Sequence, residues 1–447
     1  MRTLIKNATL VNEGTCFVGD MVINNHRIEK ISTSLTCENA TILDAEGLYL
    51  IPGMIDDQVH FREPGLTHKG TIRSESMAAV AGGITSFMDM PNTLPHVLNL
   101  ALLEEKYAIA KKDSMANYSF FMGINQNNLE DALRIDNRLI CGITDDGLYF
   151  DTKGGLMCNQ HDYLEKLFSR CDSLIALHCE VESEIDHQKQ VYEQKFGADI
   201  PPKYHALIRS EKACFEATRG VVELARKHKN RVHIFHVSTL KETELFDDLP
   251  LASKRITGEA CIHHLYFNDR DYDSKGSLIQ WNPSIKTEKD RIGLLNGLKN
   301  GRIDFIATDH APHTLKEKKG RYNEIHSGAP LVQHALPALL NLVSRGELTL
   351  TELVQFTSHN VATAYRMENR GFLREGYFAD LVLLKMNDPW TEDHKNLAYH
   401  CGWSPFFNER FMNRVVCTFV NGEIAYKEGK WNERSLGMRL TFNKDRR

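Results

Sequence analysis

The chain has 447 residues, which is enough for one large domain with a smaller one, or for two to three domains of average size. Its 42% hydrophobic and 25% charged residues are typical of a soluble globular protein, and its net charge of -5 argues against the broad basic surface that nucleic acids require. No apolar run approaches the roughly 20 residues that span a bilayer. The apolar part of residues 1–7 is too short for a signal peptide, so we predict a cytoplasmic protein without a membrane or nucleic-acid partner.

Both ends of the chain contain short strand-like segments separated by turns. Near the N-terminus they cover 3–10, 20–23, 27–31, 40–44 and 48–50. Near the C-terminus they cover 379–384, 415–420 and 423–426, and Asn421-Gly422 is typical of a hairpin turn between the last two. We therefore predict one small β-sandwich domain built from residues 1–50 and 375–430. Residues 431–447 are polar and predict a loosely held tail.

The middle of the chain alternates apolar, strand-like runs with amphipathic helices. The runs cover 51–55, 84–88, 118–122, 139–143, 174–177, 232–237, 256–262 and 303–307. The clearest helices cover 72–81, 102–111, 211–227 and 289–299. Eight such units predict an α/β fold of the (β/α)8 TIM-barrel type over residues 51–374, with its chemistry at the C-terminal ends of the strands. Glycine-rich phosphate loops are absent from the sequence.

The end of the first barrel strand is the most informative segment. Side chains alternate along a strand, so Asp56, Gln58, His60 and Arg62 are expected on one side. Burying such groups is costly unless they bind a metal, one another or a ligand. Asp56 lies deeper, so we expect it to support the ligands rather than bind metal, although a ligand role stays open. Asp57 has the opposite parity and is expected to point outside.

Other strands also end in polar side chains that would meet at the same mouth. These are Asn92, Asp146, His178, His236, Asp309 and His313. A lone histidine at a strand end is more often structural than a ligand, but imidazoles and carboxylates on several strands of one barrel together favour a zinc site. His233, His263, His264 and His310 are kept as structural candidates. Ten cysteines without CxxC pairs predict reduced thiols, with Cys179 and Cys261 in the core.

These segments carry a resemblance to a known family. DDQVHFREPG (56–65), MPNT (90–93), ALHCE (176–180), HVST (236–239), WNP (281–283), IATDHAPH (306–313) and GYFADLV (376–382) occur in this order. Together they make the chain similar to the dihydroorotases of the amidohydrolase superfamily, over essentially its whole length. The family implies a (β/α)8 barrel, a split β domain, and a metal centre that hydrolyses a cyclic amide.

The resemblance also implies roles for individual residues. His60, His178 and His236 resemble metal ligands, and Asp309 resembles the carboxylate that binds metal and transfers a proton. Arg62, Asn92 and His313 resemble the groups that hold the substrate carboxylate. Asn282 resembles a residue that hydrogen-bonds the pyrimidine ring. A homodimer is a family expectation only.

Two departures bear on the number of metal ions. The family usually has His-x-His on the first strand, and here Gln58 replaces the first histidine, which leaves a weak, neutral ligand. Many members carry a carbamylated lysine on the fourth strand, which TDDG (144–147) lacks. Other members have this TDDG pattern with its second aspartate as a ligand, which corresponds to Asp146. We therefore expect one Zn2+, with two as the alternative.

The reaction implied is the reversible hydrolysis of L-dihydroorotate to N-carbamoyl-L-aspartate in pyrimidine biosynthesis. Arg62 favours this small-molecule substrate over the related hydantoins and allantoin, which lack the ring carboxylate. The alternatives are a hydantoinase-like or allantoinase-like enzyme, or a catalytically inactive homologue with a structural role. Residues 314–329 form either a lid or a solvated charge run. Residues 181–205 are expected to cover the barrel mouth or to contact another subunit.

Overall fold

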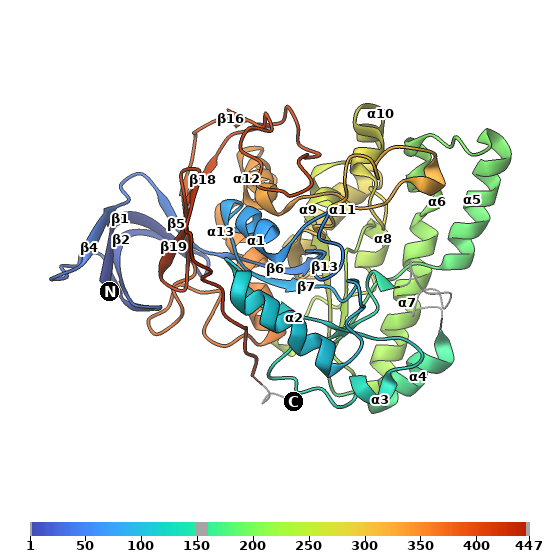
Figure 1. Cartoon of the computed structure of the whole chain (residues 1–447), viewed down its shortest axis with the longest axis horizontal. Helices are drawn as coiled ribbons and strands as arrows, with labels where there is room; N and C mark the ends of the chain where they lie inside the picture. The colour runs from blue at the N-terminus through green and yellow to red at the C-terminus, as the bar shows by residue number, and fades with distance from the viewer. Residues whose placement is uncertain (1, 149–159, 444–447) are drawn as a thin grey trace.

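The computed structural model describes residues 2–148 and 160–443. Strands from both ends of the chain form one nine-stranded sheet, which projects at the left of Figure 1. Its order is β20-β19-β18-β15-β5-β1-β2-β3, with β4 paired to β1. The strands are β1 (Arg2–Asn12), β2 (Thr15–Asn24), β3 (Arg27–Ser32), β4 (Thr41–Asp44), β5 (Tyr49–Pro52), β15 (Leu381–Lys385), β18 (Arg414–Val420), β19 (Glu423–Lys427) and β20 (Lys430–Trp431). The domain boundaries near residues 50 and 375 stay a prediction.

The join between the two chain ends lies at β5. This strand runs parallel to β1 and antiparallel to β15, so that Leu50 pairs with Leu10 on one side and with Leu383 on the other. All three side chains are buried. Burial of branched apolar side chains on one face stabilises the pairing of segments that are more than 300 residues apart in the sequence.

The (β/α)8 barrel is present as predicted. Its strands are β6 (Met54–Val59), β7 (Ile84–Asp89), β8 (Asn117–Phe120) with β9 (Met122–Gly123), β10 (Ile143–Thr144), β11 (Ile175–Leu177), β12 (Val232–Ile234), β13 (Ile256–Cys261) and β14 (Phe305–Ala307). They pair in parallel as β6-β7-β8 and as β9 through β14. A parallel bridge between Val59 and His310 closes the ring, and the His60 N–H donates to the His310 carbonyl at 2.8 Å. The run predicted over 139–143 is a strand only at Ile143–Thr144.

The helices surround the barrel, as Figure 1 shows. Larger ones are α1 (Ile72–Ala81), α2 (Leu100–Asp113), α4 (His161–Arg170), α5 (Glu182–Phe196), α7 (Glu211–His228), α11 (Glu288–Lys299) and α12 (Ala335–Ser344). Shorter ones are α3 (Leu129–Ala132), α6 (His205–Ile208), α8 (Leu240–Thr243), α9 (Ile262–Tyr266), α10 (Tyr272–Lys275), α13 (Leu350–Val354) and α14 (Asn360–Tyr365). The four helices predicted from sequence are confirmed, and Thr71, Asn99, Ser210 and Thr287 cap their N-termini.

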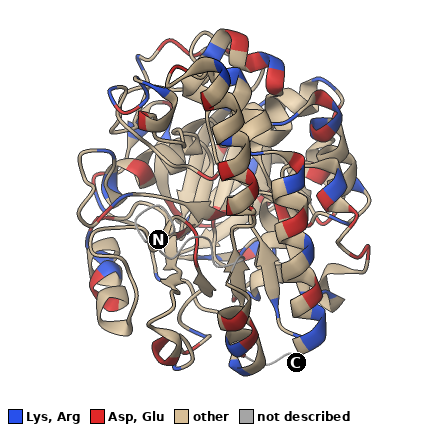
Figure 2. Cartoon of the chain, turned by 90° about the vertical axis from the view of Figure 1, so that its right-hand side faces the viewer, with Lys and Arg blue, Asp and Glu red and all other residues tan. Residues whose placement is uncertain are grey.

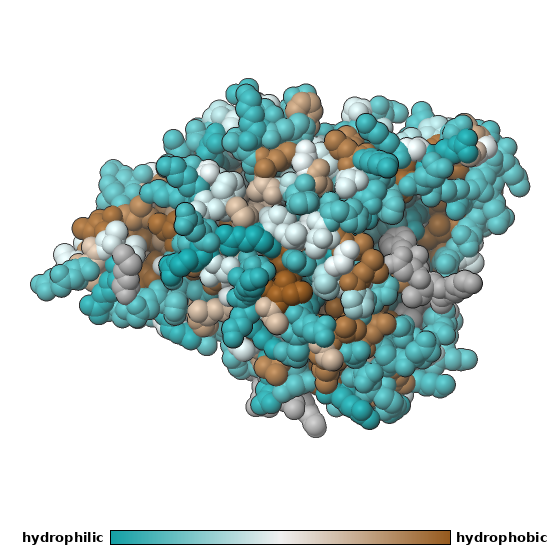
Figure 3. Space-filling view, in the orientation of Figure 1, coloured by the Kyte–Doolittle hydropathy of each residue, from teal (hydrophilic) through white to brown (hydrophobic). Residues whose placement is uncertain are grey.

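Lys, Arg, Asp and Glu of both signs are intermixed on the outer helices (Figure 2). Hydrophilic residues cover most of the face drawn in Figure 3, and hydrophobic residues appear there in scattered groups. Among the described residues, no helix is both long and apolar enough to cross a membrane. The nine described cysteines are free thiols, and Cys179 and Cys261 are buried as predicted.

The C-terminal tail differs from its prediction. The Tyr118 N–H donates to the Met438 carbonyl, and the Leu440 N–H donates back to the Tyr118 carbonyl. Leu440 and Phe442 are buried against the barrel. The tail as far as residue 443 is therefore packed rather than loosely held, because its few apolar side chains alternate with the polar ones that dominate its composition.

Candidate active site

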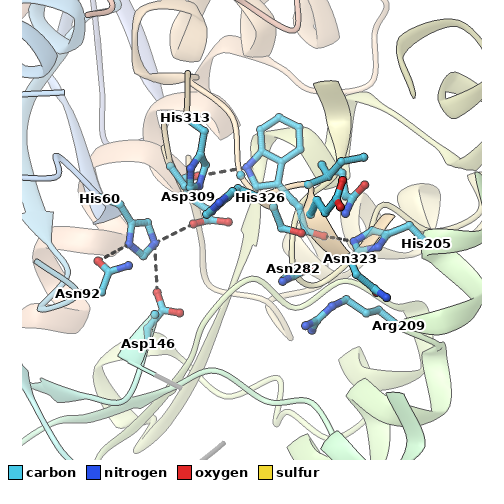
Figure 4. Close-up of a pocket in the computed structure, with 18 of the residues that line it drawn as sticks. His60, Asn92, Asp146, His205, Arg209, Asn282, Asp309, His313, Asn323 and His326 are labelled. Atoms are coloured by element: carbon cyan, nitrogen blue, oxygen red, sulfur yellow. Dashed lines mark hydrogen bonds and ion pairs between the residues drawn. The ribbon is translucent and has the colours of Figure 1, made fainter. Parts of the chain in front are cut away.

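A cavity of about 770 Å3 opens at the C-terminal ends of the barrel strands. Its inner wall carries His60, Arg62, Asn92, Asp146, Asp309 and His313, which come from strands far apart in the sequence. Figure 4 shows His60 between Asn92, Asp146 and Asp309. The structure thus brings together most of the polar groups that the sequence places at strand ends.

His60 is held by three neighbours. Its Nδ1 lies 2.9 Å from Asn92 Oδ1, an acceptor, so Nδ1 carries the proton. Its Nε2 lies 3.1 Å from Asp309 Oδ1 and 3.4 Å from Asp146 Oδ2, and both oxygens are acceptors. Burial alone would lower the pKa of His60, but the hydrogen bonds that its Nε2 donates to these two carboxylates raise it to about 9.

The two carboxylates beside His60 differ in their environment. Burial raises the pKa of Asp309 to about 6, although its hydrogen bond to His60 opposes this shift. Burial also acts on Asp146, but its hydrogen bond to His60 and the nearby His236 hold its pKa below the usual range. Asp146 is thus the more firmly ionised group, while Asp309 can exchange a proton near neutral pH.

Asp146, His178 and His236 form a compact donor set. One ligand atom from each lies within 4.8 Å of the others. His178 Nδ1 is 3.0 Å from His236 Nε2 and 3.7 Å from Asp146 Oδ1. Two imidazole nitrogens and a carboxylate oxygen that converge in a buried position are the ligands that Zn2+ accepts, so the residues present fit a zinc ion.

Glu180 orients His178, and the sequence analysis assigned it no role. Its Oε2 accepts from His178 Nε2 at 2.7 Å, which leaves Nδ1 to face the donor set. Arg209, on the pocket wall, also donates to Glu180. Burial acts to raise the pKa of Glu180, yet Arg209 and His178 hold it below the usual range. Its position two residues after His178 is the signal that alternation along the strand could have used.

A cationic corner occupies one side of the pocket. Arg62 donates from Nε to the Pro312 carbonyl at 3.1 Å, and its Nη2 lies 3.2 Å from His313 Nε2. Lys69 Nζ lies 3.2 Å from His313 Nδ1 and 2.8 Å from Glu317. Burial lowers the pKa of Arg62 to about 10, so it stays charged at neutral pH. Lys69 follows a turn rather than a strand, which is why the sequence analysis missed it.

The predicted amide groups take different positions. Asn92 contacts His60, as described above, and also lines the pocket. Asn282 lines the pocket with its buried Oδ1 atom lacking a hydrogen-bond partner within the described chain. A buried acceptor of this kind favours a donor from a bound ligand.

Gln58 does not present a lone pair to the donor set, in contrast to the weak ligand role predicted for it. Its Nε2 donates to Asp146 Oδ2 at 3.0 Å, and its Oε1 accepts from the Cys261 thiol at 3.5 Å. Burial, with Glu259 and Asp309 nearby, raises the pKa of Cys261 well above its usual value, so the sulfur keeps its proton.

The adjacent residues Asp56 and Asp57 make contacts with different parts of the barrel. Asp56 accepts from the Thr308 backbone N–H at 3.0 Å and from its hydroxyl at 2.6 Å, and so fixes the last strand to the first. Asp57 is buried, accepts from the Tyr365 hydroxyl at 2.8 Å, and lies 3.5 Å from His233, so its prediction as an outward residue is wrong. The register shifts between Asp56 and Val59, and this irregularity breaks the alternation on which the prediction depended.

The histidines kept as structural candidates lie outside the donor set. His310 contacts Glu75 through Nε2 at 2.9 Å and accepts from the Leu331 N–H, which is a structural role. His233 lies 3.3 Å from Glu259. His263 stacks on Trp281, and His264 contacts the Pro283 carbonyl. His263 and His264 begin helix α9 rather than ending a strand, so strand alternation does not govern them.

The outer wall of the pocket comes from α5 and residues 314–329. Tyr322 contacts His205 Nδ1 at 2.7 Å, and Asn323 donates to Glu193 of α5 at 2.9 Å. The buried Lys318 donates to the carbonyls of His326 and Gly328 at 2.7 and 2.8 Å. The loop is therefore a packed wall rather than a solvated charge run, and the insert at 181–205 covers the mouth.

Comparison with known proteins identifies the class. The model of the amidohydrolase family matches residues 49–425, and the chain belongs to this family. It is consequently a hydrolase, and metal dependence is general in the family. Among curated proteins, it is 32% identical to a dihydroorotase of Lactococcus lactis over 96% of this chain and 100% of that protein. It is 29% identical to a dihydroorotase of Methanosarcina acetivorans over 95% and 94% of the two chains.

Solved structures support the same fold. An L-hydantoinase (dihydropyrimidinase) from Arthrobacter aurescens superimposes with a TM-score of 0.90 at 24% identity, over 98% of this chain and 99% of that chain. A dihydropyrimidinase from Brevibacillus agri gives a TM-score of 0.87 at 21% identity, over 100% of both chains. At these identities the likeness establishes the barrel and the β-rich domain, and the substrate has to be argued from the site.

Proposed function

We propose that the chain is a zinc-dependent dihydroorotase that interconverts L-dihydroorotate and N-carbamoyl-L-aspartate in pyrimidine biosynthesis. The observation that carries this proposal is the cationic corner, which consists of Arg62, Lys69 and His313. Arg62 is two residues along the chain from His60, which lies beside the proposed metal site. A ring carboxylate needs a cation of fixed geometry at a fixed distance from the reacting carbonyl. The names of the curated relatives at about 30% identity support the same substrate.

The metal would be held by Asp146, His178 and His236, with His60 and Asp309 beside them. We expect one Zn2+, and two remain the alternative. Zinc supplies an activated water at neutral pH and polarises the amide carbonyl. Glu180 accepts from His178 Nε2 and so leaves the Nδ1 lone pair, on the side of Asp146 and His236, free to bind a metal.

Asp309 is the residue that moves the proton. Its carboxylate accepts a proton from the attacking water and delivers it to the departing ring nitrogen. Its pKa of about 6 suits both steps, because the group gives and takes a proton near neutral pH. His60 holds the carboxylate in place through its contact at 3.1 Å.

The substrate would be oriented by polar groups on opposite sides of the pocket. Arg62, with Asn92 and His313, would hold the exocyclic carboxylate. Asn282, whose buried Oδ1 has no partner within the described chain, would accept from an N–H of the pyrimidine ring. The packed wall of α5 and residues 314–329 would limit access of bulk water.

A hydantoinase-like activity is the second candidate. The cavity of about 770 Å3 exceeds a single dihydropyrimidine ring and leaves room for a ring substituent. Against it, the cationic corner would face no carboxylate on hydantoin or allantoin. A buried charge without a partner disfavours binding of such substrates.

The test compares hydrolysis of dihydroorotate, hydantoin and allantoin by protein loaded with zinc. We expect turnover of dihydroorotate and of N-carbamoyl-L-aspartate in reverse. Activity on only the other two rings would transfer the assignment to the second candidate. A metal-free protein that stays inactive after zinc addition would instead favour an inactive, structural homologue.

A further inference from the structure

Both polar atoms of the Gln58 side-chain amide make hydrogen bonds within the protein. It is fully buried, and its Nε2 donates to Asp146 Oδ2 at 3.0 Å. On the other side, Cys261 Sγ lies 3.5 Å from Gln58 Oε1 and 3.9 Å from Glu259 Oε1. The contact to Gln58 is the shorter of the two. To bind a metal, the amide would have to turn its oxygen towards the donor set and give up both hydrogen bonds.

The chemistry of its neighbours fixes the orientation of the amide. The ionised Asp146 carboxylate accepts hydrogen bonds and donates none, so it favours the N–H side of Gln58. The reversed amide would place two acceptor oxygens against each other. It would also point its NH2 group at the Cys261 S–H, leaving two donors face to face. Cys261 is therefore the second partner that keeps the amide oxygen away from the metal site.

This arrangement makes the two sides of Asp146 unequal. Oδ2 receives the Gln58 N–H and lies 3.4 Å from His60 Nε2. Oδ1 faces the other way, at 3.7 Å from His178 Nδ1 and 4.0 Å from His236 Nε2. On the Oδ1 side three ligand atoms converge. On the Oδ2 side, a donor group stands where a second ion would need a lone pair.

We propose that Gln58 is a positioning residue that confines the centre to one zinc ion, held by Asp146, His178 and His236, and that Cys261 locks Gln58 in this role. The inference rests on the zinc site of the proposed function. It specifies that the ion binds on the Oδ1 side of Asp146 and not on the Oδ2 side. His60 then acts as the partner of Asp309 rather than as a ligand. The replacement of an imidazole on the first strand is thus a change of function for that position rather than a loss.

The first experiment measures zinc per chain by elemental analysis of protein saturated with ZnCl2 and freed of excess metal. We expect about one ion in the unmodified protein and about two in Gln58→His, which restores an imidazole lone pair at this position. Anomalous diffraction at the zinc edge should place the single ion among Asp146, His178 and His236. Two ions in the unmodified protein, or one ion bound to the Gln58 oxygen or to His60, would overturn the proposal.

A further variant, Gln58→Met, separates positioning from folding. Gln58→Met keeps the volume and removes the donor, so we expect one ion with an affinity about 10- to 100-fold weaker, as is typical when a partner behind a ligand is lost. An unchanged zinc dissociation constant in a variant with an unchanged melting temperature would contradict a positioning role. The dissociation constant is read by competition with a chelating dye and needs no substrate.

Cys261 offers a matched pair. Cys261→Ser keeps a donor beside Gln58 Oε1, so zinc content should stay at about one ion per chain. Cys261→Ala removes the donor and frees the amide to turn, so binding of a second, weaker ion should appear at high ZnCl2. Equal behaviour of the two variants would show that the thiol does not lock Gln58.

The outcome is independent of the substrate. If the protein hydrolyses hydantoin instead of dihydroorotate, the proposed function fails, while the zinc count and ion position still decide this inference. If dihydroorotate is turned over by a centre with two ions, the proposed function stands and this inference fails.

Discussion

The sheet built from the two chain ends and the mouth of the barrel are both made of β-strands that end in turns, yet they use left-handed backbone differently. In the sheet, positive φ occurs at a bulge in β1 and at hairpin turns, where the tight reversal of the chain requires it. These residues are Asn7, Glu13, Asn25, Asn421 and Glu428. At the mouth, Arg62, His236 and Asp309 have φ of 69°, 38° and 48°. Aspartate and histidine adopt this conformation more readily than most residues, whereas arginine does not. The backbone at the mouth follows the needs of the site rather than local preference.

The sheet and the mouth also differ in the kind of atoms that they bury. The sheet buries hydrocarbon, as in the row of Leu10, Leu50 and Leu383. The mouth buries polar atoms, some without a hydrogen-bond partner in the described chain, such as Asn282 Oδ1 and His236 Nδ1. Such atoms destabilise an empty site and become favourable when a ligand or ion satisfies them. We conclude that the apolar regions stabilise the fold and that the mouth is held in a conformation suited to binding.

The largest effect should come from changing Asp309, the proposed proton-transfer group at the mouth. Asp309→Asn should lower turnover of dihydroorotate about 10²- to 10⁴-fold, because an amide cannot accept and return the proton. Steady-state kinetics and the melting temperature, measured together, check this expectation. Asp248→Asn, at an exposed position outside the pocket, is the control and should leave turnover nearly unchanged. A small effect at Asp309 would remove it from the mechanism.

The complementary change lies in the sheet. Leu50→Ala should lower the free energy of unfolding by about 2–5 kcal/mol, through lost burial and a cavity, while kcat stays unchanged in the folded protein. Urea denaturation with kinetics below the transition tests both halves. Val18→Ala, at an exposed position of the same sheet, should change stability by less than about 0.5 kcal/mol. A loss of kcat in folded Leu50→Ala would show that the two regions are coupled.

A smaller effect is expected at the cationic corner. Arg62→Met should raise KM for dihydroorotate about 10- to 100-fold, since a hydrogen bond to a charged group contributes about 1.5–3 kcal/mol. Any activity on hydantoin, which has no carboxylate, should not fall. Arg62→Lys keeps the charge but not the paired donors. Its KM for dihydroorotate should lie between those of the unmodified protein and of Arg62→Met. Equal losses on both substrates would mean that Arg62 supports the fold of the mouth instead of the carboxylate.

The smallest effect concerns His205, which joins α6 to the outer wall. Burial, with Arg209 nearby, lowers its pKa to about 3, so the folded protein keeps it neutral. Below pH 6.5 the unfolded chain binds a proton that the folded chain does not, so stability falls as pH falls from about 6.5 towards 3. The loss reaches about 1.4 kcal/mol per pH unit. His205→Gln should lose correspondingly less stability between pH 7 and 5.5, whereas His161→Gln, at an exposed position, should follow the unmodified protein.

Much of the architecture could be predicted from the sequence, because strand and helix periods are local signals. The eight barrel units and the sheet from both chain ends follow from apolar runs and turn residues. Asp57 was misplaced because a register shift carries no side-chain signature. The tail was misplaced because its composition is polar, although Leu440 and Phe442 are buried.

The candidate site was predictable only where it follows strand ends. Alternation along the first strand indicated His60, and position at a strand end indicated His178 and Asp309. The structure gathers all three at one mouth. Lys69 and Lys318 act from turns and loops, where spacing carries no information about direction. The orientation of Gln58 depends on Cys261, which lies 203 residues further along the chain, and no local pattern connects the two.

The seam where the barrel closes has a consequence for how the protein is made. Asp56 holds Thr308 across 252 residues of sequence, and the neighbouring His60 and Asp309 flank the same join. During synthesis, His60 can therefore meet Asp309 only after 249 further residues have been added to the chain. A chain that ends before Asp309 lacks this join, so the proposed centre can form only once the barrel has closed.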